Sequence, residues 1–441
     1  MINLPEQYGY NCKNEYYDFL PNELVYLSEL KDRELSLFVN RKGKQEPCLE
    51  LSFNNLVGKF HLVTSYFIGV DWLIKDKLSV YIEPKKNAEN GKQVNFLGML
   101  CSILKEPENY PYLADLLTID FHKPLIPIKQ KEDILSPFLL LRFLFLLRSI
   151  VRKGLKRSYY PVERNLNAKI KGKIIVSQNL KQNVMGNNFT RIFCKYDEFG
   201  INSEENQILK KAYLFTCRAI FSYKGIDCDE IKKILNYIGP AFYSVSDNVD
   251  VAKIKRFKTN PLFQEYEQAL KLALLILKRF SYNINKTNNE VILTPPFWID
   301  MSKLFELYVY RHLKKLFPMN GSVIYHQTVG HQELDFLLNG TNRDDELFKM
   351  VIDTKYKYKY KDENIYTKDA RQVSGYSRLN KVYKLLNITS PQLIDCLIIY
   401  PDAEKDYFIL NKQELEKNKD NNYANLYKIG IKLPEITTSD T

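Results

Sequence analysis

The spacing of hydrophobic residues changes twice along this 441-residue chain. Residues 1–130 alternate apolar and polar side chains in several short runs, a pattern typical of strands in a small barrel or sandwich. Residues 131–290 carry the three- and four-residue spacing of amphipathic helices. A polar segment ends this region, and residues 291–441 then mix both patterns. We therefore predict a multidomain α+β protein with a β-rich N-terminal domain, a mainly helical middle region and a C-terminal α/β domain.

The clearest local patterns give residue ranges for individual strands and helices in the first two regions. The strongest strand patterns lie at 35–39, 48–53, 60–70 and 78–83. Helices are predicted at 135–151, with Ser136 as N-cap and Pro137 at the first helical position, and at 264–280. Another is predicted to start near 202–203, where Asn202 and Glu205, three residues later, resemble a capping box. Residues 165–185, rich in Lys and Asn, have no clear assignment.

Composition narrows the class of protein further. The chain has 64 Lys and Arg against 52 Asp and Glu, and its formal net charge of +12 favours a polyanionic partner. Its seven cysteines include no Cys-x-x-Cys pair, so we expect free thiols in a reducing compartment. The most apolar segment, 134–151, is interrupted by Arg142 and Arg148, which indicates a buried helix rather than a membrane span. The start of the chain lacks a signal-peptide pattern, so we expect a cytoplasmic protein without membrane association.

Two acidic residues and a lysine mark the most informative part of the chain. Asp335 lies in the apolar run 334–338, and Asp353 and Lys355 end the run 350–355. Alternation along a strand places Asp353 and Lys355 on one face, and a hairpin between the two runs brings Asp335 to it. Such a cluster suits Mg²⁺- or Mn²⁺-dependent phosphodiester cleavage, with carboxylates as metal ligands and the lysine acting on water or charge. The alternative is a surface hairpin with solvated charges.

Two predicted helices flank this hairpin. On the first, 300–317, Glu306 lies beside the apolar stripe and is either a third metal ligand or a solvent-facing residue. On the second, 368–386, Gln372 and Tyr376 are four residues apart and share a face. Gln372 is a candidate for orienting a water or a backbone group beside the metal.

Candidate DNA contacts surround the same motif. Lysine and tyrosine alternate from Lys355 to Lys361, so in a strand the lysines share one face. These lysines suit a DNA backbone, or they protect an edge strand against aggregation, and the two interpretations are compatible. We interpret His326 and His331 as solvent-facing or DNA-contacting rather than as metal ligands. The candidate DNA-binding residues are Lys357, Lys359, Arg371, Tyr376 and Arg378.

Together these motifs resemble the PD-(D/E)xK nuclease superfamily and, within it, the McrC family, the nuclease subunits of McrBC-type modification-dependent restriction systems. Asp335 matches the first motif acid, Asp353-Thr354-Lys355 the D-x-K, and Glu306 the helical glutamate. Residues 372–376 match the Q-x-x-x-Y of the following helix, although Leu334 stands where the superfamily name has proline. The similarity covers most of residues 80–400, through strings at 82–85, 96–100, 160–174 and 194–210.

The resemblance implies a PD-(D/E)xK nuclease domain at 291–441, with a mixed sheet flanked by helices. It implies that Asp335 and Asp353 bind Mg²⁺ or Mn²⁺, with Glu306 assisting. Lys355 would act on the attacking water, Gln372 would support the site, and cleavage would leave a 5′-phosphate.

The resemblance also implies partners. These are double-stranded DNA and a hexameric ring of an McrB-like AAA+ GTPase, docked through the middle region, in defence against phage and other foreign DNA. Arg164, Lys173 and Arg191 are candidate contacts to the GTPase. The chain has no Gly-x-x-x-x-Gly-Lys-Ser/Thr motif, so the nucleotide motor is expected on another chain.

Two other functions remain open. One is a non-catalytic DNA-binding scaffold that regulates the GTPase, against which the intact Asp335, Asp353 and Lys355 argue. The other is a stand-alone DNA repair nuclease, against which the large region before residue 280 argues more weakly.

Overall fold

The computed structural model divides the chain into two compact units. It describes residues 1–9, 16–27, 34–41, 43–85, 93–106, 109, 112–113, 115–223, 226, 228–250, 264–284, 291–329, 332–357, 367–389, 392–405 and 407–436. Unit 1 comprises Met1–Leu135, Lys224–Ile226 and Glu290–Thr441, and unit 2 comprises Ser136–Tyr223 and Asp227–Asn289. The first and last thirds of the chain thus share one unit, a grouping that the sequence patterns did not indicate. The finer division into 1–130, 131–290 and 291–441 stays a prediction.

The N-terminal part of unit 1 consists mainly of strands, in agreement with its alternating sequence. Its strands are β1 (Ile2–Pro5), β2 (Leu35–Arg41), β3 (Lys44–Asn54), β4 (Lys59–Thr64), β5 (Phe67–Ile74), β6 (Leu78–Glu83), β7 (Leu117–Ile119) and β8 (Ile126–Lys129). The helices are α1 (Pro21–Leu27) and α2 (Phe96–Leu104). The four predicted strands are confirmed, except that the run 60–70 is divided between β4 and β5.

Two short strands from beyond residue 290 join these N-terminal sheets. β12 (Val291–Thr294) pairs with β8, and β13 (Phe297–Asp300) lies between β5 and β7 in the order β1-β6-β5-β13-β7. β2, β3 and β4 form a second sheet, and side chains from both sheets share one hydrophobic core. Gly69 on β5 has a φ of +151°, and a Cβ there would overlap the carbonyl oxygen of Phe297. This glycine therefore permits the close pairing of β13.

The C-terminal part of unit 1 is built on a mixed five-stranded sheet. Its order is β14 (Val323–Val329), β15 (Gln332–Thr341), β16 (Leu347–Thr354), β17 (Asp395–Pro401) and β18 (Leu426–Ile431). The first three strands are antiparallel, and the last three are parallel. The predicted hairpin at 334–355 is confirmed, with β15 continuing through Asn339-Gly340 to Thr341.

Helices cover both faces of this sheet. They are α8 (Met301–Leu316), α9 (Thr367–Ser377), α10 (Asn380–Leu386) and α11 (Lys412–Lys417). The ring of Phe336 on β15 stacks on Tyr310 of α8 at 6.0 Å between centroids. The next residue, Leu337, joins Val373 of α9 in a separate core cluster. Because successive strand residues point to opposite faces, α8 and α9 pack on opposite sides of β15.

The helix predicted at 368–386 is instead two helices. α9 ends at Ser377, and α10 begins at Asn380 after Leu379 adopts an extended conformation. Gly375 and two serines are weak helix formers just before this break, which accounts for it.

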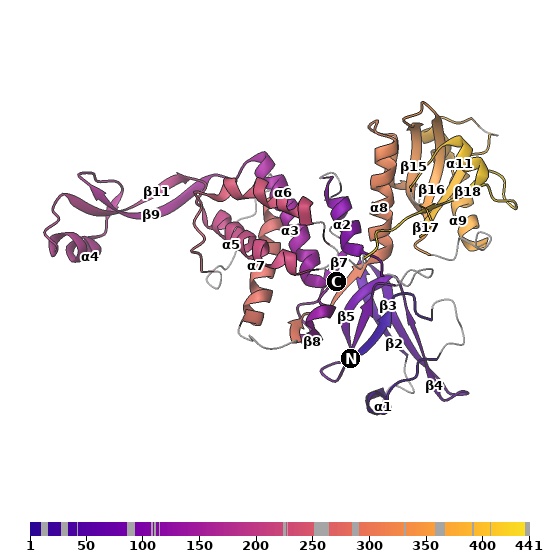
Figure 1. The fold of residues 1–441 in the computed structure, drawn as a ribbon, viewed down its shortest axis with the longest axis horizontal. Helices are drawn as coiled ribbons and strands as arrows, with labels where there is room; N and C mark the ends of the chain where they lie inside the picture. The colour runs from indigo at the N-terminus through magenta and orange to yellow at the C-terminus, as the bar shows by residue number, and fades with distance from the viewer. Residues whose placement is uncertain are drawn as a thin grey trace. The chain divides into compact units, whose positions relative to one another are not determined.

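Unit 2 combines helices with one long hairpin (Figure 1). Its helices are α3 (Leu135–Lys153), α4 (Val176–Asn179), α5 (Glu204–Ala219), α6 (Cys228–Ile238) and α7 (Gln264–Ile284). The three predicted helices are confirmed, with two corrections at their starts. Ser203 rather than Asn202 caps α5. Ser136 lies inside α3, and its hydroxyl accepts a hydrogen bond from Arg279 instead of capping the helix.

The hairpin accounts for the segment that sequence patterns left unassigned. β9 (Ser158–Asn167) and β11 (Arg191–Gly200) pair antiparallel over ten residues. β10 (Lys173–Ile174), α4 and a π-helical turn η4 (Leu180–Val184) lie at the far end, which Figure 1 shows extended away from α3, α5 and α7. Among the helices that the structure describes, none has the length and apolar character that a bilayer crossing requires.

Candidate active site

Asp335 and Asp353 lie opposite each other where the ladder between β15 and β16 ends. The last registered pair is Phe336 with Ile352, so the two acids are one residue beyond it. Thr354 donates hydrogen bonds to Asp335 Oδ2 from its backbone nitrogen (2.7 Å) and its hydroxyl (2.8 Å). The Asp335 carboxylate thus accepts the hydrogen bond that a backbone carbonyl would accept in a continued ladder. This contact joins β15 and β16 at the acidic pair.

Lys355 and Gln372 join Asp353 as predicted. Lys355 Nζ lies 2.6 Å from Asp353 Oδ2 and donates a hydrogen bond to Gln372 Oε1 at 3.1 Å. Gln372 Nε2 in turn donates to the Tyr376 hydroxyl at 2.8 Å. The four side chains meet because β16 presents Asp353 on the face that α9 covers. The structure brings these residues together, while their roles stay predictions.

The environment of Asp353 opposes a negative charge. The residue is only 1% exposed. Burial, and then the nearby charge of Asp335, raise its pKa to about 7, although the Lys355 ammonium lowers it. Burial alone would lower the pKa of Lys355, but the carboxylates of Asp353, Asp335 and Asp369 outweigh it and raise the pKa overall.

The surroundings of Asp353 fit a bound cation. Neither oxygen of Asp353 accepts a well-aligned hydrogen bond from any described group. The Lys355 ammonium pairs with Oδ2 but leaves Oδ1 without a charged partner among the described groups, and a buried carboxylate oxygen left in this way is costly. Among the described residues, no three His, Cys, Asp or Glu side chains form a metal-binding group by themselves. Mg²⁺ is commonly held by one or two carboxylates, with water and phosphate completing its shell, so Asp335 and Asp353 fit it.

Glu306 has different partners from the other predicted ligands. It projects from α8, on the opposite side of the sheet from α9, and His326 Nε2 lies 2.6 Å from its Oε1. His326 Nδ1 lies 2.7 Å from Glu333 Oε1. Burial, and then the charge of Asp335, raise the pKa of Glu306 to about 7, against the effect of His326. Glu306 is therefore close enough to Asp335 for the two charges to interact, but its hydrogen-bonding partner is His326.

His326 corrects one interpretation from the sequence. It is half-buried between two glutamates rather than solvent-facing. It lies between Tyr325 and Gln327, which pair with Phe336 and Leu334 of β15. Its φ of 52° is in the left-handed region that a non-glycine residue rarely adopts. A single histidine among apolar residues gives no sequence pattern from which its contacts with Glu306 and Glu333 could be predicted. His331 lies outside the described residues.

The candidate DNA-binding residues divide into two groups. Arg371 and Arg378 are exposed on α9 and just after it, and are free to approach a ligand from solvent. Lys357 instead forms an ion pair with Asp369 at 3.1 Å. β16 ends at Thr354, so the strand predicted through Lys361 stops earlier, and Lys359 lies outside the described residues.

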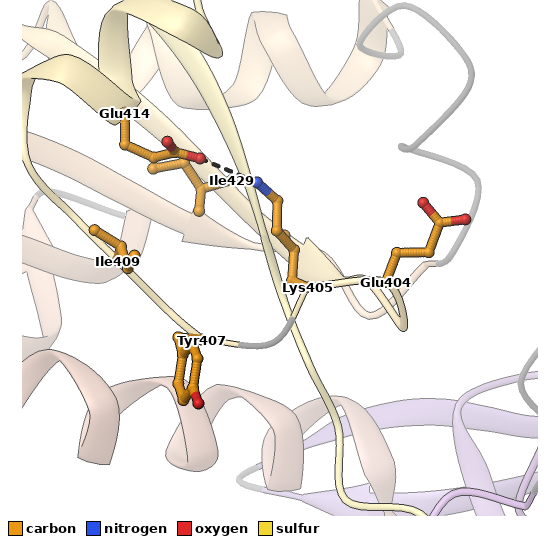
Figure 2. A pocket seen from close by; sticks show the side chains of 7 residues that line it. Glu404, Lys405, Tyr407, Ile409, Glu414 and Ile429 are labelled. Carbon is orange, nitrogen blue, oxygen red and sulfur yellow. Dashed lines mark hydrogen bonds and ion pairs between the residues drawn. The ribbon is translucent and has the colours of Figure 1, made fainter.

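A pocket of about 290 Å³ lies elsewhere in unit 1 (Figure 2). Lys405 and Glu414 form an ion pair of 3.0 Å across it. None of the predicted site residues lines it, so it adds nothing to the acidic site. Its lining residues are Glu404, Lys405, Tyr407, Ile409, Glu414, Ile429 and Gly430.

Fold and site together define a multidomain α/β protein whose mixed C-terminal sheet presents two carboxylates and a lysine at a strand end. Residues 67–401 match the family model described as "McrBC 5-methylcytosine restriction system component". The match covers most of the chain, and the protein belongs to this family of restriction-system components.

Two solved structures are also similar to this chain. One is a half-complex of Thermococcus gammatolerans McrB AAA+ hexamers with bound McrC, at 15% identity and a TM-score of 0.38, covering 100% of this chain and 97% of that one. Another is the McrBC complex of the same organism, at 16% identity and a TM-score of 0.29, covering 71% and 86%. Among curated proteins, none matches this chain.

Proposed function

We propose that this protein is the Mg²⁺-dependent DNA endonuclease subunit of its restriction system, of the PD-(D/E)xK type. The observation that carries the proposal is Asp353, a buried carboxylate beside Asp335 and Lys355 whose oxygens lack well-aligned hydrogen bonds among the described groups. Such a group is unfavourable in a protein built only for stability. Its place at a strand end, beside a second carboxylate and a lysine, supports a catalytic role.

Asp335 and Asp353 would hold the metal ion through their carboxylate oxygens. When bound, Mg²⁺ supplies Lewis acidity toward a phosphodiester and lowers the pKa of water. Thr354 holds Asp335 in place through two hydrogen bonds, so this ligand is oriented before any ion arrives. Glu306, bonded to His326, would assist from the α8 side.

Lys355 and Gln372 would act on the groups that react. The Lys355 ammonium orients the attacking water and stabilises negative charge that develops on the phosphate. Gln372 accepts a hydrogen bond from Lys355 and donates one to Tyr376, which fixes the direction of the ammonium. Lys357, Lys359, Arg371, Tyr376 and Arg378 would contact the DNA backbone nearby, where basic groups supply affinity without reading sequence.

The hairpin of unit 2 would dock the AAA+ GTPase partner. Large apolar side chains on it are exposed to solvent, which usually marks an interaction surface. Arg164, Lys173 and Arg191 are also exposed there. McrB AAA+ hexamers are named as the partner in the solved McrC structure. The exposed apolar residues are Tyr159, Ile170, Ile174, Val176, Leu180, Val184, Met185, Phe189 and Phe199.

A cleavage assay tests the nuclease proposal. The full chain, its GTPase partner, GTP and a plasmid carrying 5-methylcytosine are incubated with and without Mg²⁺. We expect cleavage only with Mg²⁺, and Lys355→Ala to reduce its rate by about 10³-fold, because charge stabilisation at the reacting phosphate is lost. Lys412→Ala, which removes an exposed lysine from α11, is the matched control. Undiminished cleavage by a folded Lys355→Ala protein contradicts the assignment.

A further inference from the structure

Tyr356 follows the predicted catalytic lysine directly and is one of the most deeply buried large side chains described. It is 2% exposed. Lys355 and Lys357 on either side of it reach Gln372 and Asp369 of α9, whereas Tyr356 points the other way. The Lys357 backbone nitrogen donates a hydrogen bond to the Lys355 carbonyl oxygen at 2.7 Å, so the chain makes a tight turn centred on Tyr356. A tyrosine anchored at the centre of this turn constrains the positions of both neighbouring lysines.

The anchor is a cradle of three polar residues that directly follow the N-terminal strands: Glu6 and Gln7 after β1, and Lys85 after β6. The Tyr356 hydroxyl donates a hydrogen bond to Glu6 Oε1 at 3.0 Å. Its carbonyl oxygen accepts hydrogen bonds from Gln7 Nε2 at 2.8 Å and from Lys85 Nζ at 3.1 Å. Lys85 Nζ also lies 3.4 Å from the centroid of the tyrosine ring. Both ends of Tyr356, backbone and side chain, are therefore held.

The cradle is internally connected and is costly to build. Glu6 Oε1 also accepts a hydrogen bond from the Lys85 backbone nitrogen at 3.1 Å, which links the ends of β1 and β6. Glu6 and Lys85 are 3% and 7% exposed. Burial lowers the pKa of Lys85 to about 8, against the effect of Glu6, and burial raises the pKa of Glu6. A buried ion pair is weak support for stability alone, and apolar residues of similar volume often serve as well.

The same tyrosine also touches the helix that carries Glu306. Its ring lies 5.5 Å from that of Phe305, the residue before Glu306, at an angle of 38°. Asp300 caps α8 by accepting a hydrogen bond from the Lys303 nitrogen at 2.9 Å, and Arg41 of β2 forms an ion pair with Asp300. The N-terminal strands thus hold both α8 and the chain at Lys355.

We propose that the cradle of Glu6, Gln7 and Lys85 positions the catalytic lysine: by fixing the carbonyl and ring of Tyr356, it sets where the Lys355 ammonium lies relative to Asp353. The inference rests on the proposed nuclease function. In this account the N-terminal part of unit 1 contributes to the nuclease site. Tyr356 is a positioning residue that acts through its neighbour, Lys355.

Two variants with matched controls test this role. Lys85→Met keeps the aliphatic stem but removes the ammonium from the carbonyl and the ring, and Tyr356→Phe removes only the hydrogen bond to Glu6. Lys59→Met and Tyr407→Phe make the same changes at exposed positions. Single-turnover cleavage of the methylated plasmid is followed with the full chain, the GTPase partner, GTP and Mg²⁺, at several DNA concentrations.

We expect Lys85→Met to lower the rate constant by about 10- to 100-fold, because small displacements of a catalytic group have effects of this size. Tyr356→Phe should lower it by a smaller factor, and Lys85→Arg should recover part of the loss. The amplitude and the half-saturating DNA concentration should not change. A purely structural role would instead lower the amplitude, which reports the folded fraction, and leave the rate constant intact.

The outcomes separate this inference from the function on which it rests. If wild type cuts and both variants keep its rate constant, the positioning role is overturned and the nuclease proposal stands. If Lys85→Met does not fold, Tyr356→Phe decides alone, because it removes one oxygen atom. If wild type shows no Mg²⁺-dependent cleavage, both proposals fail together.

Discussion

The acidic strand end of β15–β16 and the hairpin of β9–β11 depart from ordinary burial in opposite directions. At the first, Asp353 is 1% exposed although its side chain is an ionisable carboxyl group. On the second, Met185 and Phe189 are 83% and 72% exposed although their side chains are apolar. Each arrangement costs free energy in the isolated chain, since charged groups favour water and apolar groups avoid it.

The difference between the two regions indicates the size and chemistry of what each one binds. A buried carboxylate pair is suited to a small cation, which brings charge but little surface. An exposed apolar hairpin is suited to another protein, which covers surface but brings little charge. A substitution in one region that altered the binding property assigned to the other region would contradict this contrast.

Asp335→Asn carries the largest expected effect. The variant keeps the size of the side chain but loses a metal ligand, and we expect plasmid cleavage to fall by about 10³-fold, since several kcal/mol of transition-state stabilisation disappear. Stimulation of the GTPase should remain at the wild-type level. Parallel cleavage and GTPase assays measure both activities. An equal loss of GTPase stimulation would contradict the assignment of separate binding roles to the two regions.

Substitutions in the hairpin of β9–β11 should weaken binding of the GTPase partner without removing a group from the acidic site. Met185→Asp combined with Phe189→Asp should weaken binding of the GTPase partner by about 10²-fold, because buried apolar anchors at an interface each contribute roughly 1–2 kcal/mol. The control is Leu56→Asp with Val57→Asp, another exposed apolar pair. Titration calorimetry with the partner gives the affinities. Equal weakening by both pairs means that the hairpin tip has no special role.

His312 tests whether burial of a titratable group always signals function. It lies on α8 outside both regions, and burial lowers its pKa to about 4. A lowered pKa contributes stability that is present above the unfolded value near 6.5 and is lost as the pH falls toward 4. We expect its contribution to the unfolding free energy to fall by about 2 kcal/mol between pH 7 and pH 5.

Denaturant unfolding of wild type and His312→Phe at both pH values measures this contribution. The variant should show a smaller pH dependence and unchanged cleavage at pH 7. If the two proteins lose the same stability on acidification, His312 is not the group responsible.

Gln372→Ala should have the smallest effect. It removes the hydrogen bond that orients Lys355 but leaves the ion pair with Asp353, so we expect the single-turnover cleavage rate to fall by about 10-fold. Ser374→Ala, on the same helix, is the control. A variant as inactive as Lys355→Ala would place Gln372 among the essential groups instead of the supporting ones.

Much of the fold and part of the site followed from the sequence, for identifiable reasons. Alternation placed the strands, and it also placed Asp353 and Lys355 on one face, because both depend on local geometry. The contact of Glu306 with His326 depends on how α8 packs on β14, and the cradle of Tyr356 depends on residues 271 to 350 positions away in the chain. Local patterns carry no information about such long-range contacts.

The central claim is that Asp335 and Asp353 form a cation site, and metal binding tests it without reference to activity. The unfolding free energy of the full chain is measured at pH 8 as Mn²⁺ is added, for wild type and Asp353→Asn. A ligand that binds only the folded state stabilises it in proportion to the logarithm of its excess over Kd. We predict that the unfolding free energy of wild type rises with the logarithm of the Mn²⁺ concentration once Kd is exceeded, and that it does not rise in Asp353→Asn. The same rise in both proteins, or none in wild type, would contradict the account.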